Sequence, residues 1–162
     1  MEKTNVMRIL DQKKIKYQTY EYPHEDGVCV DGEAVAKLLN EDPNKVFKTL
    51  VCVDNTKHYY VCVIPVLNEL DLKKAAKAFS VKSLDMIAVK ELLPITGYIR
   101  GGCSPIGMKK QFPTIIDISG LNFDNIIFSA GKIGYQVEMN PKDLEKIIRV
   151  KFESITRGEN LC

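Results

Sequence analysis

Apolar and polar segments alternate over short distances along this chain, and this pattern predicts many short helices and strands. Four apolar residues between positions 6 and 10 recur at helical spacing, and they follow Thr4, a residue type that caps helix N-termini. A second amphipathic helix is expected over residues 71–79, whose apolar side chains fall on one face. Shorter helices are expected over residues 32–39, over 88–93 (where Pro94 would end the helix) and from Pro141 onward.

Runs of β-branched and aromatic residues predict the strands. The strongest run covers residues 46–53; a polar turn at 54–57 and a second run at 58–65 follow it, so a β-hairpin is expected. Weaker strands are expected over residues 17–22, 81–86, 114–118, 126–129 and 136–139.

This order of elements predicts an α+β fold, because short strands are numerous and the helices between them are brief. We expect a mixed sheet with a barrel-like core, flanked by helices. No repeat, low-complexity tract or long linker divides the chain, so residues 1–162 are expected to form a single domain.

Composition limits the class of protein without identifying it. Hydrophobic residues make up 45% of the chain and charged residues 27%, which is typical of a soluble globular protein. No apolar run approaches the roughly 20 residues of a membrane helix, and no apolar stretch follows the N-terminus, so no membrane association and a cytoplasmic location are expected. The net charge of +2 is too small to indicate a nucleic-acid binder by itself.

The cysteines and histidines do not predict a metal site or a disulfide framework. The cysteine number is odd, no pair has C-x-x-C spacing, and the two histidines, His24 and His58, are not placed as helical ligands. Reduced thiols and no metal are therefore expected. The five cysteines are Cys29, Cys52, Cys62, Cys103 and Cys162.

Lys48 is the most informative residue of the chain, because it interrupts an apolar strand. Strand alternation places it on one face with Val46, Leu50 and Cys52. A lysine is almost never fully buried without a partner. Lys48 either extends to a solvated edge of the sheet or lines a pocket for an anionic ligand, and the pattern alone leaves both possibilities open.

A glycine-rich segment over residues 97–107 is the second signal. Adjacent Gly101 and Gly102 permit positive φ, and their N–H groups could hold an anion or a polarised carbonyl oxygen, although an ordinary tight turn explains the pattern equally well. The segment is not a P-loop, because Met108 stands where the lysine is required. Cys103 or Ser104 could act as a nucleophile, but neither histidine is placed beside them by the sequence.

Four blocks of the chain resemble the YbaK/EbsC family. Residues 96–110 match its T-G-Y-x-x-G-G-x-S-P-x-G-x-K-K motif, and Ser129 to Gly134 match its S-x-G-K-x-G motif. Phe47-Lys48-Thr49-Leu50 and residues 72–77 are also similar, and the resemblance runs in order from about Thr4 to Phe152.

The resemblance implies a barrel-like mixed sheet and an enzyme that removes a wrong amino acid from transfer RNA, without metal or organic cofactor. Lys48 matches the lysine that contacts the terminal nucleotide, Gly101 the glycine that holds the substrate carbonyl, and Ser129 a pocket serine. The remaining substrate-binding positions that the resemblance implies are Tyr22, Thr49, Gly102 and Gln136. Some relatives carry Asp at the position of Gln136, so a charged role does not transfer there.

The implied substrate is cysteinyl-tRNA for proline, whose own thiol attacks the ester while the protein positions it and stabilises the oxyanion. Three alternatives remain: removal of alanine from the same tRNA, a non-catalytic module that binds tRNA or a synthetase, and a hydrolase that uses Cys103. The expected partners are the acceptor end of the tRNA and, in addition, prolyl-tRNA synthetase.

Overall fold

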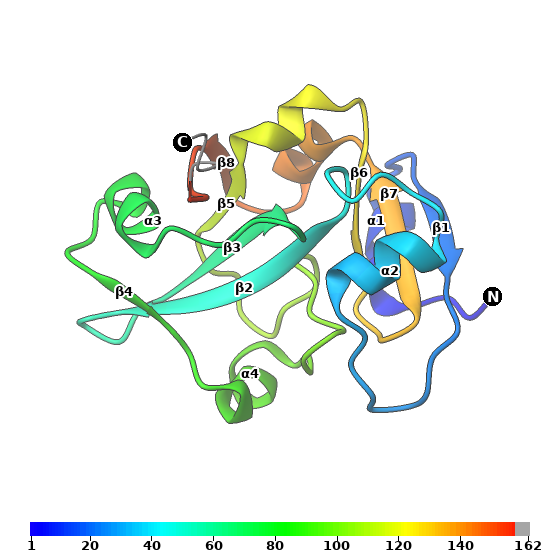
Figure 1. Cartoon of the computed structure of the whole chain (residues 1–162), viewed down its shortest axis with the longest axis horizontal. Coiled ribbons are helices and arrows are strands. Elements are labelled where there is room, and N and C mark those ends of the chain that lie inside the picture. Colours follow the sequence, from blue (N-terminus) through cyan, green and yellow to red (C-terminus); the bar gives the residue numbers. More distant parts are fainter. Residues whose placement is uncertain (158–162) are drawn as a thin grey trace.

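Two β-sheets form the centre of the molecule in the computed structural model, which describes residues 1–157 (Figure 1). The larger sheet has the strand order β4-β2-β3-β5-β8 and is mixed, because β2 runs antiparallel to β3 and β4 while β3, β5 and β8 run parallel. Its strands are β2 (Phe47–Asp54), β3 (Tyr59–Pro65), β4 (Leu84–Met86), β5 (Thr114–Asp117) and β8 (Val150–Glu153).

The smaller sheet is antiparallel and has the order β1-β7-β6. Its strands are β1 (Gln18–Glu21), β7 (Tyr135–Met139) and β6 (Ile126–Ser129). A single parallel bridge between Val46 and Ile127 joins the two sheets, and the Ile127 N–H donates to the Lys45 carbonyl at 3.0 Å. We call this junction the seam. The expected mixed α+β fold is confirmed.

The helices begin where the sequence offers capping side chains. Thr4 accepts a hydrogen bond from the Met7 N–H ahead of α1 (Asn5–Gln12), and Asp31 accepts one from the Ala34 N–H ahead of α2 (Gly32–Leu38). Asp71 caps α3 (Leu72–Phe79) in the same way. The remaining elements are α4 (Val89–Thr96) and the 3₁₀ helices η1 (Ile118–Asn122) and η2 (Pro141–Lys146).

Apolar side chains fill both sides of the larger sheet, because alternate residues of its strands point in opposite directions. One side of β2 carries Phe47 and Val51 into a core shared with α1 and the smaller sheet. The other side carries Leu50 and Cys52 toward α3. Lys48 belongs to this second side of β2 by strand alternation.

Two expectations from the sequence differ in detail from the structure, and one strand was not foreseen. Helix α4 continues past Pro94 to Thr96, where the Thr96 hydroxyl donates to the Leu92 carbonyl and Gly97 ends the helix in a left-handed conformation. The helix that begins at Pro141 is a short 3₁₀ helix, capped by Asn140. Strand β8 was not predicted. Along residues 1–157, no helix is long and apolar enough to cross a membrane.

Candidate functional site

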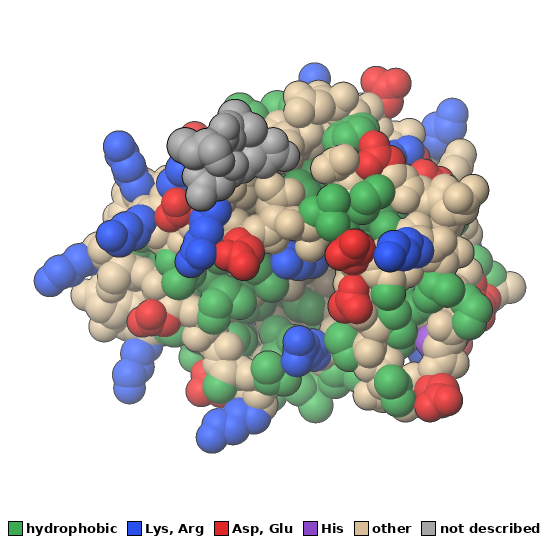
Figure 2. Space-filling view, viewed as in Figure 1, with side chains coloured by type: hydrophobic (Ala, Val, Ile, Leu, Met, Phe, Trp, Pro, Cys, Tyr) green, Lys and Arg blue, Asp and Glu red, His purple; other side chains and the backbone are tan. Residues whose placement is uncertain are grey.

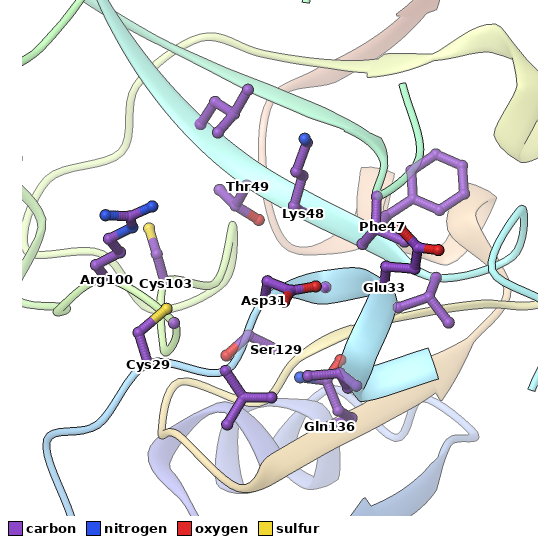
Figure 3. A pocket seen from close by; sticks show the side chains of 17 residues that line it. Cys29, Asp31, Glu33, Phe47, Lys48, Thr49, Arg100, Cys103, Ser129 and Gln136 are labelled. Carbon is purple, nitrogen blue, oxygen red and sulfur yellow. The ribbon is translucent and has the colours of Figure 1, made fainter. Parts of the chain in front are cut away.

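An open pocket of about 380 Å³ lies beside the seam and is enclosed by residues from both sheets. Strand β2, the start of α2, the loop at residues 100–103 and the facing ends of β6 and β7 form its walls (Figure 3). Of the residues singled out by the sequence, the pocket brings together Lys48, Thr49, Gly101, Ser129 and Gln136. These positions are up to 88 residues apart in the chain, and only the meeting of the two sheets makes them neighbours.

Lys48 lines the pocket at its outer side. In Figure 3 its ammonium points away from Ser129 and Gln136, so the charge does not face these two residues. Burial lowers the pKa of Lys48, and the carboxylate of Glu69 opposes that shift in part. A half-buried ammonium in this position favours an anionic group of a ligand at the pocket entrance.

Thr49 provides a buried hydroxyl that the fold does not satisfy. Its Oγ1 has no hydrogen-bond partner among the described residues, although it is buried. The edge of β2 beside Thr49 also has no neighbouring strand within residues 1–157. Strand β4 pairs with Cys52–Asp54, and the last hydrogen bond along this edge runs from the Ile87 N–H to the Val51 carbonyl. Buried polar groups are normally paired, so a ligand group is the expected partner here.

The two adjacent glycines have different surroundings. Gly101 has a φ of +90° and lines the pocket, and a Cβ there would lie 3.0 Å from the Cys29 sulfur. No backbone hydrogen bond is found for its N–H within residues 1–157. Gly102 differs: its N–H donates to the Ile99 carbonyl at 2.9 Å, a Cβ added there would lie 3.1 Å from the Ile133 nitrogen, and the residue is not among those that line the pocket. Of these two glycines, only Gly101 has a backbone N–H that is left without a backbone hydrogen bond in residues 1–157.

Ser129 and Gln136 form the floor of the pocket. They are paired in the register of β6 and β7, so that their side chains lie on the same face of the smaller sheet. Both side chains are buried, and the Ser129 hydroxyl accepts a hydrogen bond from the Gly131 N–H at 3.1 Å. This floor is polar and uncharged.

Tyr22 lies outside the residues that line the pocket. It is almost fully buried, and its hydroxyl has no partner among the described residues. Burial raises the pKa of Tyr22, and the neighbouring Cys29 contributes to the shift. Because Cys29 does line the pocket, Tyr22 is adjacent to the site without forming its surface.

Sequence reasoning missed three charged residues of the pocket. Asp31 and Glu33 lie at the start of α2 opposite β2, and Arg100 lies at the far end beside Cys103 (Figure 3). Asp31 had a detectable signal as a helix cap, but a cap gives no information about which cavity it faces. The pocket therefore has carboxylates on one wall and cations at its outer end.

Cys103 is not suited to act as a nucleophile. Burial raises the pKa of its thiol to about 12, so that the thiol stays protonated at neutral pH. The four cysteines within the described residues are unpaired, and Cys162 lies outside them. Residues 1–157 hold no group of three or more side chains that could bind a metal ion.

These features define a small α+β domain whose pocket is lined by a half-buried ammonium and an unpaired hydroxyl. Comparison with known proteins gives the family. Residues 27–147 match the aminoacyl-tRNA editing domain. The chain is also 45% identical over 158 residues, covering 98% of this chain and 96% of its relative, to a protein of Enterococcus faecalis named as a proposed Cys-tRNA(Pro)/Cys-tRNA(Cys) deacylase, EbsC.

Solved structures share the fold at low identity. A proposed trans-editing enzyme for prolyl-tRNA synthetase has a TM-score of 0.79 at 21% identity and covers 94% of this chain and 95% of its own. The hypothetical protein APE2540 has a TM-score of 0.82 at 18% identity, covering 94% and 99%. The chain belongs to the aminoacyl-tRNA editing domain family, as its motifs indicate.

Proposed function

We propose that this chain deacylates mischarged transfer RNA, with cysteinyl-tRNA for proline as its substrate. One observation carries the proposal: Lys48, Thr49 and Gly101 line a single open pocket of about 380 Å³, so that a cation, a free hydroxyl and a free amide surround the same space. The name of the Enterococcus faecalis relative supports the choice of substrate.

Each residue of the pocket has a role in this proposal. The ammonium of Lys48 holds a phosphate of the terminal nucleotide at the entrance, and the Gly101 N–H donates to the ester carbonyl oxygen as negative charge develops there. Thr49 hydrogen-bonds the ribose or the ester, and Ser129 and Gln136 contact the amino acid side chain. The carboxylates of Asp31 and Glu33 attract the ammonium of the amino acid, which is a role that the motifs do not indicate.

In the proposed reaction the substrate supplies its own nucleophile. The sulfur of the cysteinyl group attacks its ester carbonyl carbon, a C–S bond forms and the C–O bond to the ribose breaks. The thiol proton goes to the ribose oxygen, which leaves as the tRNA hydroxyl, and water later hydrolyses the thiolactone. The protein contributes position and charge stabilisation, which agrees with a buried, protonated Cys103.

The choice between cysteine and alanine depends on the substrate thiol. A pocket separates side chains that differ by one small group by only about 1–3 kcal/mol, so the alanyl ester would enter the same pocket. If the reaction uses the thiol, release from alanyl-tRNA is far slower than release from cysteinyl-tRNA. Equal rates would favour the alanine branch of the family.

Replacement of Lys48 tests the proposal. Lys48→Ala is expected to lower kcat/KM for cysteinyl-tRNA by about 100-fold, because it removes the cation at the entrance. The matched control is Lys142→Ala, since Lys142 is exposed on η2 and is not among the residues that line the pocket. Full activity of Lys48→Ala at an unchanged Tm contradicts the proposed role.

The setting of the reaction completes the proposal. The domain acts on tRNA in the cytoplasm, where aminoacylation takes place, and it receives the mischarged tRNA from prolyl-tRNA synthetase. The fold shared with a proposed trans-editing enzyme for that synthetase supports this partner. We further propose that one domain carries the whole activity, because both sheets contribute to the same pocket.

A further inference from the structure

Charge is strongly segregated along this chain despite the small net value. Residues 72–90 carry five lysines and one carboxylate, whereas residues 21–42 carry seven carboxylates and one lysine. The first segment forms α3, β4 and the start of α4, and the second surrounds α2. The pocket residues of β2 and of the loop at 100–103 lie between these two regions. Figure 2 shows Lys and Arg side chains gathered at the left end, where Figure 1 places α3 and β4.

Three of these lysines border one groove. Lys73, Lys77 and Lys82 line a shallow depression between α3 and β4, together with Ser83. All three side chains are exposed, and none forms an ion pair with a described carboxylate. Lysines at positions 73 and 77 are neighbours on one helix face, so three ammonium groups point to one strip of surface without a counter-charge in the fold.

The groove lies on the same side of the larger sheet as Lys48. Leu50 and Cys52 follow Lys48 on one face of β2 and pack with Ala75 and Ala76 of α3. Four residues of strand span about 13 Å, so the distance from the pocket entrance to the groove is comparable to a few phosphate spacings of a nucleic acid. A polyanion whose end enters the pocket can therefore continue over α3 without leaving the surface.

We propose that the acceptor stem of the RNA docks in this groove, with its phosphates on Lys73, Lys77 and Lys82, while its 3′ end enters the pocket past Lys48. This inference rests on the proposed function, because it assumes that RNA is the substrate. The direction is set by charge: the carboxylates around α2 repel a phosphate backbone, so the stem leaves the pocket over α3 and not over α2. Recognition is of the backbone, independent of base sequence.

The test uses the triple variant K73A/K77A/K82A of the full chain and uncharged tRNA for proline as the probe. The Kd of the variant for this tRNA is expected to rise at least about tenfold at low salt. The slope of the logarithm of the binding constant against the logarithm of the salt concentration is expected to become shallower by about two to three, because three phosphate contacts are lost. The matched control, K13A/K16A/K142A, removes the same charge from exposed lysines outside both the groove and the pocket and is expected to bind as the wild type does.

A second substrate separates this inference from the proposed function. On the cysteinyl ester of the trinucleotide CCA, which has no stem, the triple variant is expected to match the wild type, whereas its KM for full cysteinyl-tRNA rises. An unchanged Kd and slope in the triple variant overturn the inference even if deacylation is found. Equal losses in both triple variants overturn it too, because they would indicate only net charge. Loss of tRNA binding in a protein without deacylase activity would instead leave the groove in place and refute the proposed function.

Discussion

Tyr22 and Thr49 are the two residues within 1–157 whose buried side-chain oxygen has no hydrogen-bond partner, and of the two only Thr49 lines the pocket. Its hydroxyl is buried and unpaired among the described residues, in a strand where a valine would fill the same space. Leaving a buried hydroxyl without a partner costs about 1–3 kcal/mol of folding free energy. Such a cost is understandable where a substrate completes the hydrogen bond.

Thr49→Val tests this interpretation. The variant is expected to keep or slightly raise the Tm, since it removes an unsatisfied polar atom, and to lower kcat/KM by about tenfold through the lost substrate hydrogen bond. Thr114→Val is the matched control: Thr114 is also buried, but its hydroxyl donates to the Phe112 carbonyl at 3.0 Å. That variant should lose about 1 kcal/mol of stability and keep its activity per folded molecule. The reverse pattern would refute the role of Thr49.

Gly101→Ala separates backbone strain from contact. Gly101 and Gly27 have φ values of +90° and +75°, so alanine costs about 1–2 kcal/mol at either position. Only at position 101 does the new Cβ meet the backbone and sulfur of Cys29, whereas at Gly27 nothing lies within 4 Å. We expect Gly101→Ala to lose deacylation and Gly27→Ala to retain it, as measured by release of labelled cysteine from tRNA. Equal activities would exclude Gly101 from oxyanion binding.

Cys103 gives a prediction for thiol reactivity. Because burial raises the pKa of its thiol to about 12, the thiol is neutral throughout the range of an ordinary assay. We expect Cys103→Ser to stay active, and iodoacetamide to label the exposed Cys29 in its place. Peptide mapping of the alkylated protein identifies the site. Loss of activity in Cys103→Ser with an intact fold would restore the hydrolase alternative.

At the scale of elements, the β2–β3 hairpin depends on one aspartate. Asp54 accepts hydrogen bonds from the backbone and hydroxyl of Thr56, from the His58 N–H and from the Tyr60 hydroxyl. Burial alone would raise the pKa of Asp54, but these bonds, led by that of His58, outweigh it and lower the pKa to about 2. The turn is therefore tied to the ionised carboxylate.

Acid should loosen this hairpin in a defined window. Since the folded pKa lies below the ordinary value of 3.8, the stabilisation is complete above about pH 4 and is lost as the pH falls toward 2. Asp54→Asn is expected to lower the Tm at pH 7 and to flatten its decline between pH 5 and 2, followed by circular dichroism. Asp124→Asn, at an exposed position, serves as control. An unchanged acid profile in Asp54→Asn would refute this assignment.

Local patterns predicted the elements well wherever a cap or a turn had its own side chain. Thr4 was expected to cap the first helix and does so, and the hairpin of β2 and β3 forms around its expected turn. Strand β8 was not predicted because it has only four residues, two of them charged, and its extended conformation is stabilised by pairing with β5. Helix α4 passes Pro94 because the last turn is held by Thr96, which no propensity anticipates.

The sequence predicted those site residues that belong to recognisable motifs and no others. Lys48 is visible in the sequence as a cation in an apolar strand, and Gly101 as part of a glycine pair. That Gly102 bonds to Ile99 instead of facing the pocket depends on the path of the loop. Glu33 could not be assigned, because its place opposite β2 arises from the way the smaller sheet and α2 meet the larger sheet.

At the scale of the whole molecule, the separation of acidic from basic residues matters more than the net charge. The acidic region around α2 and the basic region of α3 and β4 lie on opposite sides of the pocket, so the field orients an approaching polyanion before contact. A protein of net charge +2 can in this way bind RNA weakly and still in one orientation.

Neutralising the acidic side should increase binding and reduce its directionality. E25Q/D26N changes two exposed carboxylates, and we expect tRNA affinity to rise a few-fold at low ionic strength and the gain to vanish at high salt. The matched control is D124N/E145Q, on exposed positions near the 3₁₀ helices. Fluorescence anisotropy at several salt concentrations measures both. A gain that persists at high salt would contradict a purely electrostatic effect.

The seam has a further consequence for the lifetime of the active form. Within residues 1–157 the bridge at Val46 and Ile127 is the one backbone β-bridge between the two sheets, which otherwise meet through the side chains of their shared core, and the pocket takes walls from each sheet. A small separation of the sheets would dismantle the pocket while most backbone pairing inside each sheet persists. Heating should therefore abolish catalysis some degrees before the circular dichroism signal falls, and amide hydrogens around Ile127 should exchange sooner than those at the centre of β3.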